Sequence, residues 1–119
     1  MEHRYSSRVP TDIKMLIYRR GVPVATGRIR NASRVGVFIE TDYPELRRYQ
    51  PLECEFRLAG EIPATRHRFS AHVSRQANVG VGLEVNDEDA RSRAEMECLL
   101  QWTMPVSRLA ESSRMSATA

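Results

Sequence analysis

Two short patterns near the N-terminus combine residue types that bind anions. The first is a pair of arginines, Arg4 and Arg8, four residues apart in a polar stretch. The second is Asn31, Ser33 and Gly36, which lie just before an apolar run. An arginine guanidinium holds phosphate oxygens in pairs and also matches the O6/N7 edge of guanine. An asparagine amide supplies a donor and an acceptor together. The two patterns therefore indicate a site for an anion or a nucleotide.

Positive charge is concentrated in the same part of the chain. The first 36 residues carry eight basic and two acidic side chains, whereas the whole chain has a formal net charge of +3. All of the 18 basic residues except Lys14 are arginines. Genomic base composition can account for the number of arginines but not for their placement. The placement favours a negatively charged ligand near the N-terminal third.

Other titratable residues do not indicate catalysis or a metal site. His67 and His72 are five residues apart on a strand or its approach, so we expect them on opposite faces, at the surface, and as poor metal ligands. Cys54 and Cys98 match no zinc spacing and are expected to be buried, reduced thiols. The acidic run at 87–89 suits the start of a helix better than a catalytic cluster. The sequence therefore predicts a binding protein without a cofactor rather than an enzyme.

The elements that must position these residues are mostly strands. Apolar runs and alternating apolar residues predict six of them, at 14–18, 22–30, 35–40, 52–58, around 69–73 and at 79–85. Gly27 is a candidate β-bulge, and the connection after Glu40 is expected to be irregular or briefly helical. Six short strands with short connections predict an antiparallel barrel or sandwich.

Only the C-terminal part is predicted to be helical. Asn86 is a candidate N-cap, and the acidic residues after it would lie in the first turn of the helix. The helix is expected to dock on the strands through Ala90, Ala94, Cys98 and Trp102, with Leu99 beside them. The tail beyond Pro105 is small and polar, which predicts fraying.

The two N-terminal patterns, taken together and in this order, resemble the PilZ domain family. Its hallmarks are an RxxxR arm and, about 20 to 30 residues later, a [D/N]xSxxG motif. The resemblance extends from Arg4 to the C-terminal helix, and residues 71–75 and 80–85 look like the last strands of the family's barrel. It implies a mainly β fold, a six-stranded antiparallel β-barrel with a C-terminal α-helix. We divide the chain into a flexible ligand-binding arm (1–10), the barrel with its helix (11–104) and a disordered tail (105–119).

The resemblance also implies a function, that of a bacterial cytoplasmic receptor for cyclic di-GMP that passes the signal to an unidentified partner protein. Arg4 and Arg8 would contact the phosphates and the Hoogsteen edge of guanine. Asn31 and Ser33 would hydrogen-bond guanine from the barrel surface.

Two further positions complete the implied site. Gly36 would either adopt a backbone angle closed to other residues or allow close approach of the base. Arg75 would stack on a guanine ring in a cation–π contact.

Two other functions stay open. A small basic barrel could bind RNA or single-stranded DNA without sequence preference, which the positive first third fits. Aromatic residues make up only 7% of the chain, however, and leave few stacking platforms, which makes nucleic acid a weaker candidate. A PilZ-like adaptor could bind only protein, although such members generally lose the arginines. No apolar run approaches bilayer length and the N-terminus is polar, so neither a signal peptide nor membrane insertion is expected.

Overall fold

The computed structural model of the chain describes residues 8–103. Arg4, the rest of residues 1–7 and the predicted tail lie outside the described residues. The elements are β1 (Val9–Arg19), β2 (Val22–Ala32), β3 (Gly36–Glu40), β4 (Pro51–Phe56), β5 (His67–Gln76), β6 (Gly80–Val85) and α1 (Ala90–Thr103).

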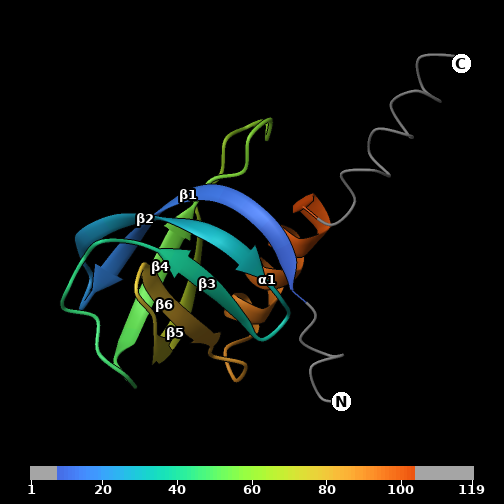
Figure 1. Cartoon of the computed structure of the whole chain (residues 1–119). Helices are drawn as coiled ribbons and strands as arrows, with labels where there is room; N and C mark the ends of the chain where they lie inside the picture. The colour runs from blue at the N-terminus through green and yellow to red at the C-terminus, as the bar shows by residue number, and fades with distance from the viewer. Residues whose placement is uncertain (1–7, 104–119) are drawn as a thin grey trace, which may run out of the picture.

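The six strands close into one antiparallel barrel in the order β1-β2-β3-β6-β5-β4 (Figure 1). This architecture confirms the predicted six-stranded barrel with a C-terminal helix. β1 and β2 meet in a tight hairpin, where Arg20 and Gly21 have φ values of 54° and 78°. Two successive left-handed residues are typical of the hairpin turns that follow the natural twist of strands.

β1 begins earlier than the apolar run at 14–18 predicts. Val9 pairs with Ala32 and Pro10 pairs with Asn31, so the first residues of β1 extend the hairpin with β2. The last two residues of the predicted arm are therefore part of a barrel strand. This extension brings Arg8, the residue before β1, next to the end of β2.

Alternating apolar side chains fill the barrel. Phe69, Ala71 and Val73 of β5 point inward as predicted, and Cys54 of β4 is buried among them. Burying each large apolar side chain contributes about 1.5 to 3 kcal/mol, so this alternation fixes which face of each strand points inward. The connection at 41–50 forms no helix. Its Leu46 is buried in the core, and its carbonyl accepts a hydrogen bond of 2.7 Å from the Gln76 amide.

The helix begins later than predicted, and its cap is a different residue. α1 starts at Ala90, and Asp89 caps it by accepting a hydrogen bond of 3.2 Å from the backbone amide of Arg91. The Asp89 carboxylate also accepts a hydrogen bond of 2.6 Å from the Ser92 hydroxyl. Asn86 instead stabilises the preceding turn, where its side chain accepts from the amide of Glu88 at 3.2 Å. The acidic run thus precedes the helix, and the first turn itself contains no acidic residue.

The predicted docking face of the helix is correct in its second half, where Leu99 is buried and Cys98 and Trp102 pack against the core, but wrong in its first half. Ala90 and Ala94 are exposed, whereas the buried positions are Ser92, Met96, Leu99, Leu100 and Thr103, which face β5 and β1. The hydrophobic pattern missed Ser92 because its burial depends on hydrogen bonds. Its hydroxyl accepts from the amide of Ser70 at 2.8 Å while it donates to Asp89. No helix within residues 8–103 is long and apolar enough to cross a membrane.

Candidate functional site

Ser33 shapes the tight turn between β2 and β3. Its amide donates to the carbonyl of Gly36 at 2.8 Å. Its hydroxyl accepts from the amides of Val35 and Gly36, each at 3.2 Å. Only 1% of Ser33 is exposed. The hydroxyl is therefore engaged by the turn, and its hydrogen bond to guanine, which the resemblance implies, stays a prediction.

Gly36 is required by the packing of the barrel itself. Its φ is not in the left-handed region. A Cβ at this position would lie 2.3 Å from the carbonyl oxygen of Leu83 in β6, closer than side chains can approach. The sequence left two roles open for Gly36, an unusual backbone angle or the close approach of another group. The structure shows close approach, and the approaching group is the neighbouring strand β6.

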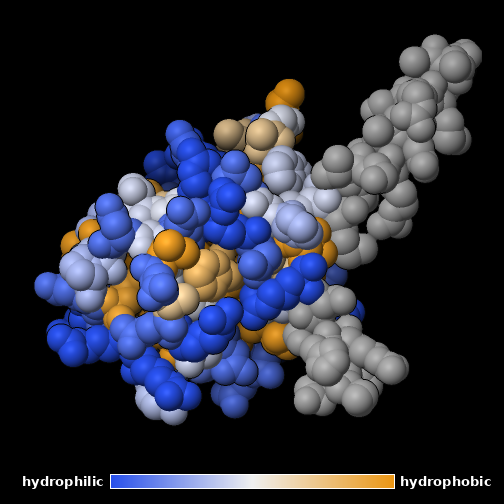
Figure 2. Space-filling view, viewed as in Figure 1, coloured by the Kyte–Doolittle hydropathy of each residue, from blue (hydrophilic) through white to orange (hydrophobic). Residues whose placement is uncertain are grey.

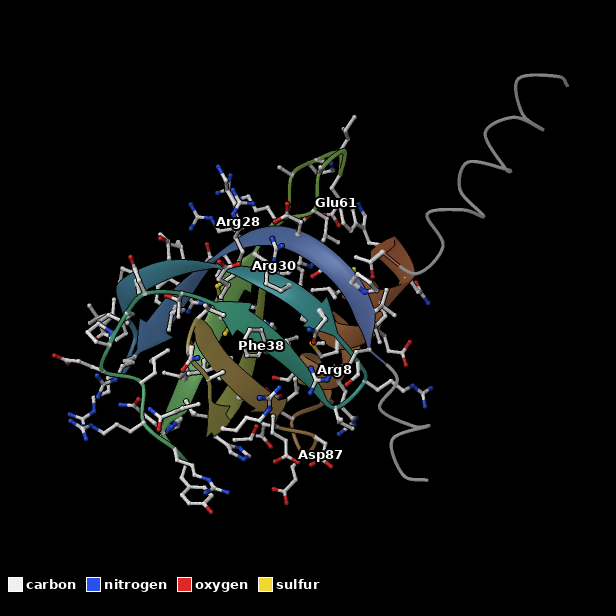
Figure 3. All side chains as sticks on the ribbon, in the orientation of Figure 1. Arg8, Arg28, Arg30, Phe38, Glu61 and Asp87 are labelled. Atoms are coloured by element: carbon white, nitrogen blue, oxygen red, sulfur yellow. The ribbon has the colours of Figure 1, made fainter. Side chains whose placement is uncertain are left out.

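Four residues form a row across the barrel surface, which we call the outer row. Asn31 of β2 pairs with Phe38 of β3, Phe38 pairs with Gly82 of β6, and Gly82 pairs with Arg75 of β5. Figure 3 shows Phe38 and Arg8 on the face of the barrel toward the viewer. Figure 2, from the same side, shows a small apolar area among hydrophilic side chains in the middle of this face.

Two β-bulges turn the polar members of the outer row toward solvent. The register shifts at Arg30, so Asn31 pairs with Phe38 rather than with Val37, which would be its partner in a regular ladder. The register shifts again at Ser74, just before Arg75. Each extra residue reverses the face of the residue after it, so side chains that would share the inner face point outward. The bulges thus expose Asn31 and Arg75 on one surface.

The bulge that the sequence suggested at Gly27 is absent. Gly27 pairs regularly with Met15 of β1. A glycine is needed there because a Cβ would lie 2.8 Å from the carbonyl oxygen of Glu40. The glycine marks a close approach of strands rather than an extra residue.

Two guanidinium groups converge on the outer row. Arg8 donates from Nη1 to Oδ1 of Asn31 at 2.8 Å. Arg75 lies with its guanidinium carbon 5.5 Å from the centre of the Phe38 ring, within cation–π range. The aliphatic part of the Arg75 side chain lies over Gly82, because a Cβ added to Gly82 would lie 3.0 Å from Arg75 Cγ. Partial burial and the charge of Arg75 lower the pKa of Arg8, so the two cations are close enough to repel each other.

Other arginines nearby are paired with carboxylates. These pairs are Arg28 and Arg30 with Asp12 at 2.8 and 3.2 Å, and Arg34 with Glu97 at 3.6 Å. Within residues 8–103, by contrast, no carboxylate lies within salt-bridge distance of Arg8 or Arg75. Among the described residues, Arg8 and the outer row therefore keep an uncompensated positive charge beside an aromatic ring and an amide, an arrangement suited to a planar anionic ligand.

The structure brings together Arg8, Asn31 and Arg75 of the predicted site, places Ser33 and Gly36 in the turn beside them, and adds Phe38. Sequence reasoning missed Phe38, although a signal was present. Val37 and Ile39 flank it and point inward, so alternation places an aromatic ring outward two residues after the glycine of the [D/N]xSxxG pattern.

Comparisons with known proteins agree with this architecture. The family model described as the PilZ domain matches residues 2–102. The crystal structure of the PilZ domain of CeSA from a cellulose-synthesizing bacterium superposes with a TM-score of 0.66 at 20% sequence identity. The match covers 79% of this chain and 94% of that chain, and at this identity it shows a common fold. No curated protein sequence matches this chain. Since the family model spans most of its length, the chain belongs to the PilZ domain family.

Proposed function

We propose that this chain is a cytoplasmic receptor for cyclic di-GMP that acts by binding, without a cofactor, and passes the signal to a partner protein. The observation that carries the proposal is the convergence of Arg8 and Arg75 on the outer row with no carboxylate between them in the described chain. A cyclic dinucleotide has two phosphates and two flat bases. Its negative charge would remove the repulsion between the two guanidinium groups.

Arg8 and three residues of the outer row have distinct tasks in this proposal. Arg8 contacts a phosphate or the O6/N7 edge of guanine, and Asn31 holds the Arg8 guanidinium in place through its amide oxygen. Phe38 and Arg75 form a stacking surface for a base. Arg4 completes the arginine pair from outside the described residues. Ser33 and Gly36 contribute by holding the turn that positions Asn31.

The alternative functions receive less support from these contacts. Binding of single-stranded nucleic acid usually requires a series of aromatic platforms along a groove, and the outer row has one aromatic ring, that of Phe38. A compact dinucleotide matches this single platform better. An adaptor that binds only protein would have no use for the Arg8–Asn31 pair, which is intact.

Calorimetry with two cyclic dinucleotides tests the proposal. Cyclic di-GMP should bind at micromolar affinity or better, about −8 kcal/mol, and cyclic di-AMP at least about tenfold more weakly, because adenine presents a donor where guanine presents the O6 acceptor. Arg57→Ala removes an exposed arginine outside the outer row and is the matched control for Arg8→Ala. Equal affinity for the two dinucleotides, or equal effects of the two substitutions, would exclude guanine recognition by Arg8.

A further inference from the structure

A second polar cluster lies where the loop at 57–66 meets β5 and α1. His67 is only 5% exposed. Its Nε2 lies 2.8 and 3.0 Å from the two carboxylate oxygens of Glu61, and its Nδ1 lies 2.7 Å from Oε1 of Glu95. Figure 3 labels Glu61 on this loop, away from Phe38. The sequence-based expectation that His67 lies at the surface is wrong, because His67 begins the inward-facing row of β5.

Cys98 joins the same cluster. One ligand atom from each of Glu61, His67 and Cys98 lies within 4.8 Å of the other two. Cys98 and Glu95 are three residues apart on α1 and therefore share a helix face. The loop, the strand and the helix each bring one potential ligand to a single point. A thiol, an imidazole and a carboxylate are the ligand types of zinc, whereas calcium and magnesium prefer oxygen ligands alone.

The His67 ring is held in the orientation that such a site requires. Phe56 stacks on it, with ring centroids 5.0 Å apart and planes inclined by 17°. The Nδ1 contact with Glu95 occupies the ring nitrogen that does not face Glu61. Histidine ligands in metal sites commonly donate their second ring N–H to a carboxylate, which fixes the tautomer and leaves the other nitrogen for the metal. Glu95 fits this supporting role, and Nε2 fits that of the ligand.

We propose that Glu61, His67 and Cys98 bind a zinc ion, with Glu95 orienting the His67 ring through Nδ1. The ion takes the place of the proton shared by His67 Nε2 and the Glu61 carboxylate. It also displaces the proton of the Cys98 thiol, and both protons pass to solvent. The thiolate and the Glu61 carboxylate together balance the charge of the ion. The Glu61 side chain is 30% exposed, which gives the ion a route from solvent and room for water as a fourth ligand.

Cobalt in place of zinc provides a spectroscopic test on the full chain, after treatment with a chelator. Co²⁺ should give a thiolate-to-cobalt charge-transfer absorption together with the visible bands of tetrahedral coordination. Cys98→Ser should abolish the charge-transfer band. Both Cys98→Ser and Glu61→Gln remove a direct ligand and should weaken zinc affinity by at least the roughly 10- to 100-fold that loss of a supporting contact typically causes. Zinc should raise the melting temperature of the parent chain, because it binds the folded form, and this rise should be lost in both variants.

Two control variants separate this site from adventitious binding. Glu97→Gln changes an exposed carboxylate of α1 outside the cluster, and Cys54→Ala removes the only other cysteine, so both should bind zinc like the parent chain. Glu61 lies on a loop and partly in solvent, so its substitution tests the site even if Cys98→Ser fails to fold. The absence of a charge-transfer band, or unchanged zinc affinity in Glu61→Gln, would overturn the proposal.

Discussion

Substituting Gly36 by alanine should destabilise the protein in the absence of any ligand. The new Cβ would lie 2.3 Å from the carbonyl oxygen of Leu83, whereas comfortable contact begins above 3.4 Å. β3 and β6 would therefore have to separate locally by roughly 1 Å. Two hydrogen bonds of 2.8 Å depend on this geometry, from the Ser33 amide to Gly36 and from the Val85 amide to Val35.

The expected loss of stability follows from these contacts. Forcing one extra carbon into a packed barrel costs about 1 to 3 kcal/mol. Weakening two hydrogen bonds adds about 1 kcal/mol or more. A total of about 2 to 4 kcal/mol is a large part of the 5 to 15 kcal/mol that stabilises a typical domain. The melting temperature should fall by roughly 10 to 30 °C.

Thermal and urea denaturation without ligand measure this effect, with Gly82→Ala as the matched control. Gly82 is also a buried strand glycine, but a Cβ there would meet the flexible stem of Arg75 at 3.0 Å rather than a backbone carbonyl. Its substitution should change stability by no more than about 1 kcal/mol, since a compatible Gly→Ala change restricts the unfolded chain. If Gly36→Ala melts like the parent chain but no longer binds cyclic di-GMP, the glycine serves the ligand and our structural assignment is wrong.

Three other predictions concern the ligand site and the helix. Arg8→Ala should cost about 2 to 4 kcal/mol of cyclic di-GMP binding and Arg75→Ala only about 1 kcal/mol, both by calorimetry and without a change in the melting temperature of the free protein. Loss of folding in Arg8→Ala would instead make that arginine part of the scaffold. The hydrogen bond from Ser92 lowers the pKa of Asp89. The pKa of Asp89 is therefore lower in the folded state than in the unfolded state. Ionised Asp89 stabilises the fold at pH values above its unfolded-state pKa, and this contribution is lost as the pH falls through its folded-state pKa. In the Asp89→Asn variant, stability measured by circular dichroism should therefore fall less steeply as the pH is lowered. An unchanged dependence on pH would show that Asp89 does not cap the helix. Amide exchange at residues 4–8 should slow when cyclic di-GMP binds, whereas strong protection in the free protein would show a preformed site.

Local periodicity in the sequence predicts the features that depend on neighbours along the chain. Alternation correctly placed Phe69, Ala71 and Val73 on the inner face of β5. These predictions succeed because a strand's two faces alternate with a period of two residues, whatever the strand pairs with.

Features that depend on distant partners could not be predicted in the same way. The bulges at Arg30 and Ser74 are properties of strand pairing and leave no mark in either strand alone. Ser92 and His67 are buried polar residues whose partners come from other elements, so a hydrophobic pattern places both at the surface. Asp89 and Asn86 are equally good caps by type, and the docking of the helix decides between them.

Arginine content alone could not show where positive charge persists, because the fold decides which guanidinium groups are neutralised. Asp12 pairs with two arginines of the first third, and Glu97 pairs with another from the distant helix. Arg8 differs, since its acceptor is the Asn31 amide, which holds the guanidinium in place without cancelling its charge. Arg75 lies over an aromatic ring, which likewise positions a cation without neutralising it. Because both contacts fix position and leave the charge intact, an anion that reached the outer row would meet two oriented donors and would have no carboxylate of residues 8–103 to displace from either.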